Sequence, residues 1–298
     1  MTENEHPRGR HFKLGDRVHI VDSRDRHYLI TLQHNGEFHT HAGLFTHADL
    51  VGQPEGTTIA LQRGMTYTCL HPTLEDFVLK MPRGAQVIYP KDIGPILILA
   101  DVFPGARILE SGVGSGALSS AMLRMGAEIV GYELREDFAN RARTNVESLL
   151  GPDVLSRYKV ELRDCYDGID ERDMDRVILD LPEPWRVVPH AEKALHPGGI
   201  LLAYTPSITQ ATQVRQAMEG DGWILQRTLE VLNRGWYIEG MAVRPDHRMV
   251  AHTGFLTTGR WIGNGARSIT PAQREPKVRG PQLEPYDTPS ETDEGPGT

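Results

Sequence analysis

A short glycine-rich segment constrains this chain more than any other feature of its sequence. An apolar run over residues 106–109 leads into Glu110, and glycines follow at alternate positions: Gly112, Gly114 and Gly116. Alternate glycines let the backbone turn sharply and approach a ligand closely, because they carry no Cβ. A helix-like run over residues 117–125 follows at once. The segment therefore predicts a strand, a ligand-binding loop and a helix.

Glu110 bears on the kind of ligand that this loop binds. A loop built for a pyrophosphate would not place a carboxylate beside the ligand, whereas a loop built for a cationic nucleoside could use one. The same loop also satisfies the dinucleotide fingerprint through Ala117, and Glu133 lies 21 residues after Gly112, where a ribose-binding acid is expected. A turn that binds no ligand would need fewer glycines and no acid. The loop alone leaves S-adenosylmethionine (SAM) and a nicotinamide dinucleotide as alternatives.

Bulk properties exclude several classes of protein. The 298 residues are 24% charged and 39% hydrophobic, which is typical of a globular protein with no membrane association. The longest apolar stretch, Ile96–Ala100, is too short to span a bilayer, and the N-terminus lacks the apolar core of a secretion signal. Cys69 and Cys165 show no pairing or metal spacing, so we expect a cytoplasmic location. The net charge of −8 argues against nucleic-acid binding unless a local basic groove or an oligomer provides it.

The chain divides into four predicted segments. Residues 1–10 are polar and are predicted to be flexible, and residues 263–298 are rich in Pro, Gly, Glu and Thr and are predicted to be disordered. Residues 11–80 show short strand-like runs, with predicted hairpins over 17–32 and 57–70 and no long helical period. They predict a small β-rich domain. Residues 81–262 form the predicted main domain.

Strands and helices alternate through most of this main domain. Strands are predicted at 107–110, 128–133, 158–163, 176–180 and 199–204, with helices at about 116–126, 137–150, 185–195 and 207–219. This alternation predicts an α/β fold with a doubly wound, mostly parallel sheet. Two further strand-like runs, 224–231 and 253–258, are predicted to close a seven-stranded sheet as an antiparallel pair.

Acids follow two of the predicted strands at the edge where ligands bind in such sheets. Glu133 ends the second strand and can accept hydrogen bonds from both ribose hydroxyls of a nucleoside; a charge at the start of the next helix is the alternative. Asp164 follows the third strand, where an acid can accept the exocyclic amine of adenine; an ordinary turn aspartate is the alternative.

The fourth strand ends in the segment Asp180-Leu-Pro-Glu-Pro-Trp185. Two prolines stiffen the backbone and remove amide donors, and the aromatic residue offers a stacking face. The segment resembles the loops with which amino-group methyltransferases hold a flipped purine, and a nicotinamide-dependent dehydrogenase has no need of it. A rigid turn in which Pro184 and Trp185 start a helix is the structural alternative.

Several motifs occur in a specific order along the chain. They are Met81–Asp92, the Glu110 loop, Asp180–Trp185, Tyr204–Gln210, Arg234-Gly-Trp236, Arg244-Pro245 and His252–Leu256, together with Glu37–His41 near the N-terminus. Over roughly residues 12–262 the set closely resembles the prokaryotic tRNA (adenine-58-N1)-methyltransferases, which are class I SAM-dependent enzymes. One departure is Ser111, where the family more usually has alanine.

The resemblance implies a homotetramer that methylates N1 of adenine 58 in the T loop of tRNA with SAM as cofactor. It implies that Gln86, Ser115 and Gly116 line the cofactor pocket. Tyr89, Asp180 and Tyr204 are carried over as residues near the methyl group and the target base. Some archaeal relatives also modify adenine 57. The alternatives are a methyltransferase for another substrate, such as the isoaspartyl type, and a catalytically silent tRNA-binding subunit.

Two groups of side chains are assigned no chemistry. His39, His41 and His47 lack the cysteine or acid that would complete a tetrahedral metal site, so we expect no metal and interpret them as packing or RNA-contacting residues. The tryptophans of the C-terminal part are expected in the core or at an interface. These are Trp223, Trp236 and Trp261.

Overall fold

The computed structural model describes residues 11–84 and 86–263. The predicted flexible N-terminus (1–10) and, apart from residue 263, the predicted disordered tail (263–298) lie outside the described residues. Within the described part, no helix is both long and apolar enough to cross a bilayer.

The N-terminal part is a small β structure, as expected. A four-stranded antiparallel sheet has the order β2-β1-β6-β5, and β3 and β4 form a separate hairpin. The strands are β1 (Arg17–Asp22), β2 (His27–Thr31), β3 (Glu37–Thr40), β4 (Gly43–Thr46), β5 (Thr58–Ala60) and β6 (Thr66–Leu70), with 3₁₀ turns at His47–Asp49 and Gln62–Gly64. Both predicted hairpins are confirmed, whereas β3 and β4 were not predicted as a pair. Alternate strand residues such as Val18, Ile20 and Tyr67 fill the core of this part.

A helix also lies between residues 11 and 80, where none was expected. Helix α1 (Leu74–Lys80) spans two turns, which is too short to produce a visible helical period. Thr73 caps it, because its hydroxyl accepts the Asp76 amide while the Asp76 carboxylate accepts the Thr73 amide. Phe77 and Val78 are fully buried in the core of the larger domain.

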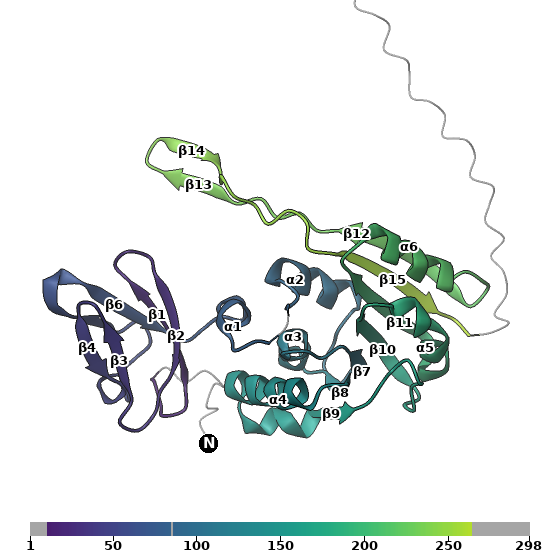
Figure 1. The fold of residues 1–298 in the computed structure, drawn as a ribbon, viewed down its shortest axis with the longest axis horizontal. Coiled ribbons are helices and arrows are strands. Elements are labelled where there is room, and N and C mark those ends of the chain that lie inside the picture. Colours follow the sequence, from purple (N-terminus) through teal and green to yellow (C-terminus); the bar gives the residue numbers. More distant parts are fainter. Residues whose placement is uncertain (1–10, 85, 264–298) are drawn as a thin grey trace, which may run out of the picture. The chain divides into compact units, whose positions relative to one another are not determined.

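The larger domain is built on the expected seven-stranded sheet, with the order β12-β15-β11-β10-β7-β8-β9 (Figure 1). All neighbours pair in parallel except β15, which runs antiparallel to both β11 and β12. The predicted antiparallel closing pair is therefore confirmed. The strands are β7 (Arg107–Ser111), β8 (Glu128–Glu133), β9 (Tyr158–Leu162), β10 (Met174–Asp180), β11 (Leu195–Thr205), β12 (Trp223–Glu230) and β15 (Phe255–Trp261).

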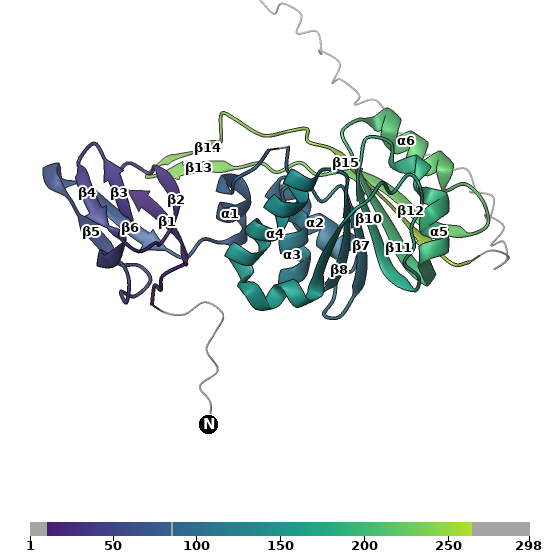
Figure 2. The ribbon, with the colours of Figure 1, turned by 60° about the horizontal axis from the view of Figure 1, so that its bottom comes forward.

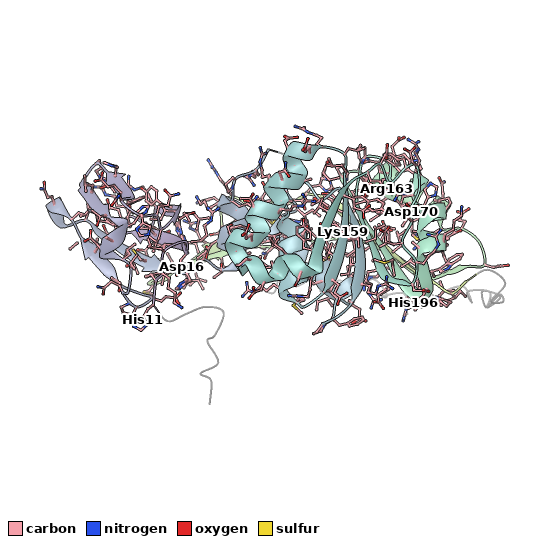
Figure 3. All side chains as sticks on the ribbon, turned by 90° about the horizontal axis from the view of Figure 1, so that it is seen from below. His11, Asp16, Lys159, Arg163, Asp170 and His196 are labelled. Atoms are coloured by element: carbon pink, nitrogen blue, oxygen red, sulfur yellow. The ribbon has the colours of Figure 1, made fainter. Side chains whose placement is uncertain are left out.

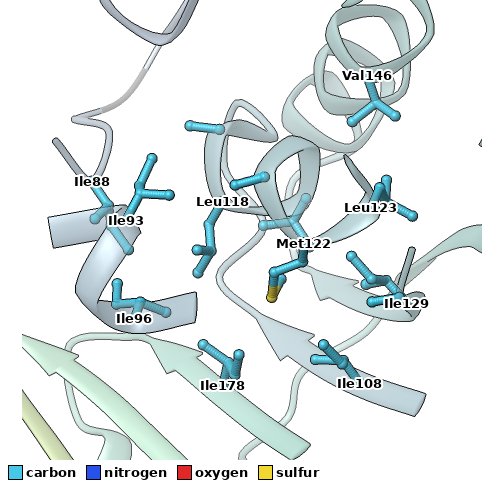
Figure 4. Close-up of a cluster of buried hydrophobic side chains, with 14 of the residues drawn as sticks. Ile88, Ile93, Ile96, Ile108, Leu118, Met122, Leu123, Ile129, Val146 and Ile178 are labelled. Atoms are coloured by element: carbon cyan, nitrogen blue, oxygen red, sulfur yellow. The ribbon is translucent and has the colours of Figure 1, made fainter. Parts of the chain in front are cut away.

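Helices cover both faces of this sheet (Figure 2). They are α2 (Pro90–Leu99), α3 (Ala117–Arg124), α4 (Glu136–Leu150), α5 (Val188–Ala194) and α6 (Ile208–Ala217), with 3₁₀ turns at Pro152–Arg157 and Pro184–Arg186. Successive residues of β7 show the two layers, since Ile108 faces the core under α2, α3 and α4 and Leu109 faces the core under α5 and α6. Figure 4 shows the first layer, in which Ile96, Leu118 and Met122 pack above Ile108 and Ile178.

Two elements of this domain were not predicted. Helix α2 contains Pro90, Gly94 and Pro95, which usually break helices. Pro90 occupies the first helical position, where no amide donor is needed, and burial of Ile93 and Ile96 stabilises the rest. The hairpin of β13 (Trp236–Glu239) and β14 (Ala242–Pro245) extends away from the sheet between β12 and β15 (Figure 1).

The three tryptophans of the C-terminal part differ in their burial. Trp223 and Trp261 are buried and their rings lie 5.1 Å apart, so the core prediction is confirmed for both. Trp236 lies on the hairpin and is 59% exposed. Of the two expected positions, core or interface, the core is therefore excluded for Trp236 within the described chain, and an interface stays a prediction.

The chain reverses its direction of winding between β7 and β10. It proceeds from β7 outward to β8 and β9 and then crosses back to β10 and β11. The carboxyl ends of β7 and β10 therefore lie side by side at a switch point, where open α/β sheets bind ligands. In Figure 3, Arg163 and Asp170 lie near this carboxyl edge, whereas His196 lies at the opposite edge and pairs with Asp175 at 3.1 Å.

Candidate active site

A pocket opens at this switch point. Six of its eleven lining residues were predicted to bind the ligand or to lie near the reaction: Gln86, Glu110, Gly112, Gly114, Ser115 and Asp180. The other five are apolar and provide the wall: Val87, Ile88, Val113, Ala117 and Leu118. An apolar wall with a few converging polar groups is typical of a small-molecule site.

The three glycines of the loop are needed for different reasons. Gly112 has φ +85°, and a Cβ there would lie 2.0 Å from the Asp180 carbonyl oxygen. Gly116 has φ +79° at the start of α3, and a Cβ would crowd the Ala142 backbone at 3.1 Å. Gly114 has φ +57°, and a Cβ there would make only an ordinary contact of 3.9 Å with the Gly112 carbonyl oxygen. Gly112 and Gly116 therefore allow close packing against Asp180 and Ala142, whereas the surroundings of Gly114 leave room for a ligand.

Glu110 is almost fully buried at the end of β7. Its Oε2 accepts a hydrogen bond of 2.5 Å from the Ser119 hydroxyl on α3, and Ser119 in turn accepts a hydrogen bond of 3.0 Å from the Tyr158 phenol on β9. Burial raises the pKa of Glu110 to about 8; the Ser119 hydrogen bond lowers it in part, and the nearby Asp180 and Glu133 carboxyl groups raise it. A cation bound beside Glu110 would favour its ionised form and so offset this rise in pKa.

Asp180 ends β10 and lies in register with Tyr204 on β11. Burial raises the pKa of Asp180 to about 7. Glu133, at the end of β8, ties the loop from behind: its Oε2 accepts the Gly114 amide at 3.0 Å and its Oε1 accepts the Arg135 amide at 3.0 Å. Each of its oxygens keeps a second lone pair for a hydroxyl group.

Several predicted residues lie outside the pocket lining. Glu133 and Gly116 support the loop from behind it. Asp164 follows β9, and its Oδ1 accepts the Tyr166 amide at 2.8 Å, as in the turn that was the structural alternative. Tyr89 caps α2 and is partly buried.

Tyr204 lies beside Asp180 at the same edge of the sheet. Its ring rests on the Gly254 backbone, since a Cβ at that glycine would lie 2.5 Å from the phenol carbon. Burial raises the pKa of Tyr204 to about 12, and Asp92, Asp180 and Tyr89 are among the groups that raise it. Asp180, Tyr204 and Tyr89 are therefore close enough to influence one another electrostatically.

Some residues of the site were not predicted from the sequence. Asn145 on α4 is buried, and its Nδ2 donates to the carbonyls of Ser115 and Pro82, both at 2.9 Å, so it ties the loop to the segment before Gln86. Asparagine is a poor helix former. Its occurrence on the apolar face of a helix is a signal that could have identified it.

Two side-chain assignments are decided by packing. Trp185 lies in a 3₁₀ turn and packs partly buried against the core under α5, which favours the structural alternative over a stacking platform. His47 is buried and its Nδ1 accepts the Gln33 amide at 3.0 Å. Within the described residues, no three His, Cys, Asp or Glu side chains are grouped as metal ligands.

The pocket suits a nucleoside that carries a positive charge. The Ser115 hydroxyl is buried and has no hydrogen-bond partner in the described chain, so it is available to a ligand. Gly114 leaves room for close approach, and Glu110 and Asp180 can ionise beside a cation. A cation would favour the ionised forms of these two acids, whereas a pyrophosphate would oppose their ionisation. These observations favour SAM over a nicotinamide dinucleotide.

Comparison with known sequences points in the same direction. The model of the family "tRNA methyltransferase complex GCD14 subunit" matches residues 64–246, and the "TrmI-like N-terminal" model matches residues 11–59. The tRNA (adenine(58)-N(1))-methyltransferase TrmI of Thermus thermophilus is 34% identical over 246 residues, which cover 81% of this chain and 96% of that protein.

Solved structures show the same similarity. The tRNA (m1A58) methyltransferase TrmI of Aquifex aeolicus is 27% identical with a TM-score of 0.73, and the match covers 84% of this chain and 98% of that one. A protein of Thermotoga maritima described as a SAM-dependent O-methyltransferase is 30% identical with a TM-score of 0.79, over 85% of this chain and 95% of that one.

Proposed function

This chain belongs to the TrmI/GCD14 family of tRNA (adenine-58-N1)-methyltransferases, and from this membership we propose how its residues carry out the reaction. The protein transfers a methyl group from SAM to N1 of adenine 58 in tRNA. The roles below of Asp180, Tyr89, Tyr204 and the residues that bind the cofactor are our proposal.

We assign the cofactor to the pocket at the switch point. SAM supplies a methyl group on a positively charged sulfur. When ionised, Glu110 and Asp180 provide the negative potential that favours this cation, and Gln86, Ser115 and the glycine loop hold it from the side. Glu133 would accept hydrogen bonds from the ribose hydroxyls through its second lone pairs. Asp164 would accept a hydrogen bond from the adenine amine.

Asp180 is assigned to the target base. Adenine N1 carries an in-plane lone pair and needs no deprotonation before it attacks a methyl group, so alignment is the main requirement. The methylated base is cationic, with its charge shared with the N6 amino group. A carboxylate that accepts a hydrogen bond from N6 stabilises this charge as it develops. Tyr89 and Tyr204 would hold the extruded base beside Asp180.

One observation supports this assignment most strongly. The Asp180 side chain lines the cofactor pocket, and its backbone carbonyl lies directly against Gly112. The residue that would contact the base and the loop that would hold the methyl donor are therefore in direct contact. A catalytically silent tRNA-binding subunit would not require this arrangement.

Mass spectrometry of nucleosides tests the function. Unmodified tRNA transcript is incubated with the purified chain and SAM, and a transcript with guanine at position 58 is the control. We expect 1-methyladenosine in the first tRNA and none in the second. Binding without product would support a silent subunit, and a methylated 2′-oxygen would support an O-methyltransferase.

Assembly, compartment and domain organisation are also proposals. We propose a homotetramer, supported by exposed apolar side chains on the β13–β14 hairpin, among them Trp236, Ile238 and Val243. We propose a cytoplasmic location, since Cys69 and Cys165 are both free thiols. A small β domain over 11–80 and a methyltransferase domain over 81–262 remain our division, although the burial of Phe77 favours a boundary before α1.

A further inference from the structure

A buried ion pair lies at the start of α2, next to Tyr89. Lys91 Nζ is 2.9 Å from Asp92 Oδ1, and the two side chains are 8% and 0% exposed. Neither residue lines the cofactor pocket. Burying two charges is costly unless further hydrogen bonds satisfy them, so an ion pair in this position requires an explanation.

Both members of the pair reach distant segments of the chain. Lys91 Nζ donates a 2.7 Å hydrogen bond to the carbonyl of Val231, directly after β12. Asp92 Oδ2 accepts a 2.6 Å hydrogen bond from the Thr253 hydroxyl, just before β15. Val231 and Thr253 lie at the beginning and near the end of the segment between β12 and β15 that carries the β13–β14 hairpin, and we call these two residues the hairpin roots. The pair therefore fixes both roots to one turn of α2.

The same contacts reach Tyr204. Thr253 lies near enough to the Tyr204 phenol to lower its pKa, and the neighbouring Gly254 backbone supports the Tyr204 ring. Tyr89 caps the helix turn that carries Lys91 and Asp92, and its carbonyl accepts the Asp92 amide at 2.8 Å. Lys91, Asp92 and Thr253 thus form a connected group that reaches Tyr89 through α2 and Tyr204 through the Thr253–Gly254 segment.

We propose that Lys91, Asp92 and Thr253 are positioning residues that fix Tyr89 and Tyr204 relative to each other and link the base site to the hairpin roots. This inference depends on the proposed role of the two tyrosines. It explains the burial of an ion pair outside the pocket, because a carboxylate held between a fixed ammonium and a hydroxyl has one orientation.

Replacement of Thr253 tests the proposal with little change in shape. Thr253→Val removes the hydroxyl that donates to Asp92 and lies near the Tyr204 phenol, and it leaves the Lys91–Asp92 pair intact. We expect kcat for tRNA methylation to fall about 10- to 100-fold, since misplaced groups cost rates of this order. The SAM dissociation constant should stay unchanged, and Thr253→Ser should restore kcat.

Thr228→Val is the matched control. Thr228 lies on β12, and its hydroxyl bonds to the Thr257 hydroxyl at 3.0 Å, away from Asp92. This variant should methylate at the wild-type rate. If Thr253→Val does not fold, Thr253→Ala provides the same comparison, because it also removes the hydroxyl and leaves the Lys91–Asp92 pair in place.

The outcomes separate this inference from the proposed function. A folded Thr253→Val protein with wild-type kcat overturns the inference, as does a parallel loss of SAM affinity, which would indicate collapse of the pocket. Tyr204→Phe is measured alongside. If Tyr204→Phe is slow and Thr253→Val is not, only the positioning role fails. If Tyr204→Phe is also unaffected, the proposed role of Tyr204 fails.

Discussion

The carboxylates of the pocket differ in what holds them. Glu110 is fixed by the Ser119 hydroxyl, which is itself oriented by Tyr158, whereas Glu133 is fixed by backbone amides. Asp180 has no comparable side-chain partner, and burial alone raises its pKa. Asp180 is therefore the carboxylate left free to bond to a ligand, which is what a base-binding role requires.

Cofactor binding should release protons. The free protein holds a proton on Glu110 below about pH 8 and on Asp180 below about pH 7. Both pKa values are raised above those of ordinary carboxyl groups, and a bound sulfonium favours the ionised forms, so the affinity for SAM should rise between pH 6 and pH 8. Other titratable or charged groups near the three carboxyl groups are Tyr158, the Arg143 guanidinium that acts on it, and Tyr204 beside Asp180.

Calorimetry in buffers of different ionisation enthalpy measures this release directly. Glu110→Gln should release fewer protons and show a weaker dependence on pH. S-adenosylhomocysteine, which lacks the positive sulfur, should also show a weaker dependence in the wild-type protein. An affinity for SAM that is constant across this range would contradict the proposed charge state of the pocket.

Among the elements, the loop between β7 and α3 depends most on glycine. Gly112→Ala would place a methyl group against the Asp180 carbonyl, whereas Gly151→Ala has the same kind of backbone strain, with φ +86° and no atom within 4 Å. Both changes should cost about 1–3 kcal/mol of folding free energy for a backbone conformation that side chains rarely adopt, and Gly112→Ala should cost more because of its contact with Asp180.

Only Gly112→Ala should also distort the pocket. Thermal unfolding and SAM binding are measured for both variants. We expect cofactor affinity to fall at least tenfold for Gly112→Ala, because Asp180 must move, and to stay at the wild-type level for Gly151→Ala. Equal affinities in the two variants would show that the contact between Gly112 and Asp180 does not shape the site.

Elements that local sequence determines were predicted well. The glycine loop, the strand that ends at Asp180 and the order of strands and helices follow from patterns within a few residues. Helix α2 was missed because burial of Ile93 and Ile96 overrides the unfavourable Pro95. The contacts of Asn145 with Ser115 and of Asp92 with Thr253 span 30 and 161 residues, and no local pattern indicates such pairs.

For the whole molecule, the β13–β14 hairpin is the feature that a single chain does not explain. Ile238 and Val243 are cross-strand partners and are 71% and 60% exposed, and Met241 at the turn is fully exposed. Neighbouring apolar side chains of this kind usually mark an interface. They support the proposed homotetramer, in which other subunits could also supply the positive potential that an acidic chain needs to bind RNA.

Light scattering tests this assembly. The double variant Ile238→Ser/Val243→Ser should shift the mass from four chains toward fewer, and tRNA affinity should weaken while SAM affinity is retained. Leu162→Ser changes a similarly exposed side chain, 58% exposed at the end of β9, and serves as the control. A wild-type protein that is monomeric at micromolar concentration would contradict the tetramer.

The most direct measurement is the single-turnover rate of 1-methyladenosine formation at position 58 by Asp180→Asn, with cofactor and tRNA saturating. The side chain keeps its size and loses the charge that would stabilise the methylated base, so we predict a rate about 10²–10³-fold below wild type. Asp153→Asn, at an exposed aspartate, should methylate at the wild-type rate. Undiminished methylation by Asp180→Asn would contradict the central role of this carboxylate.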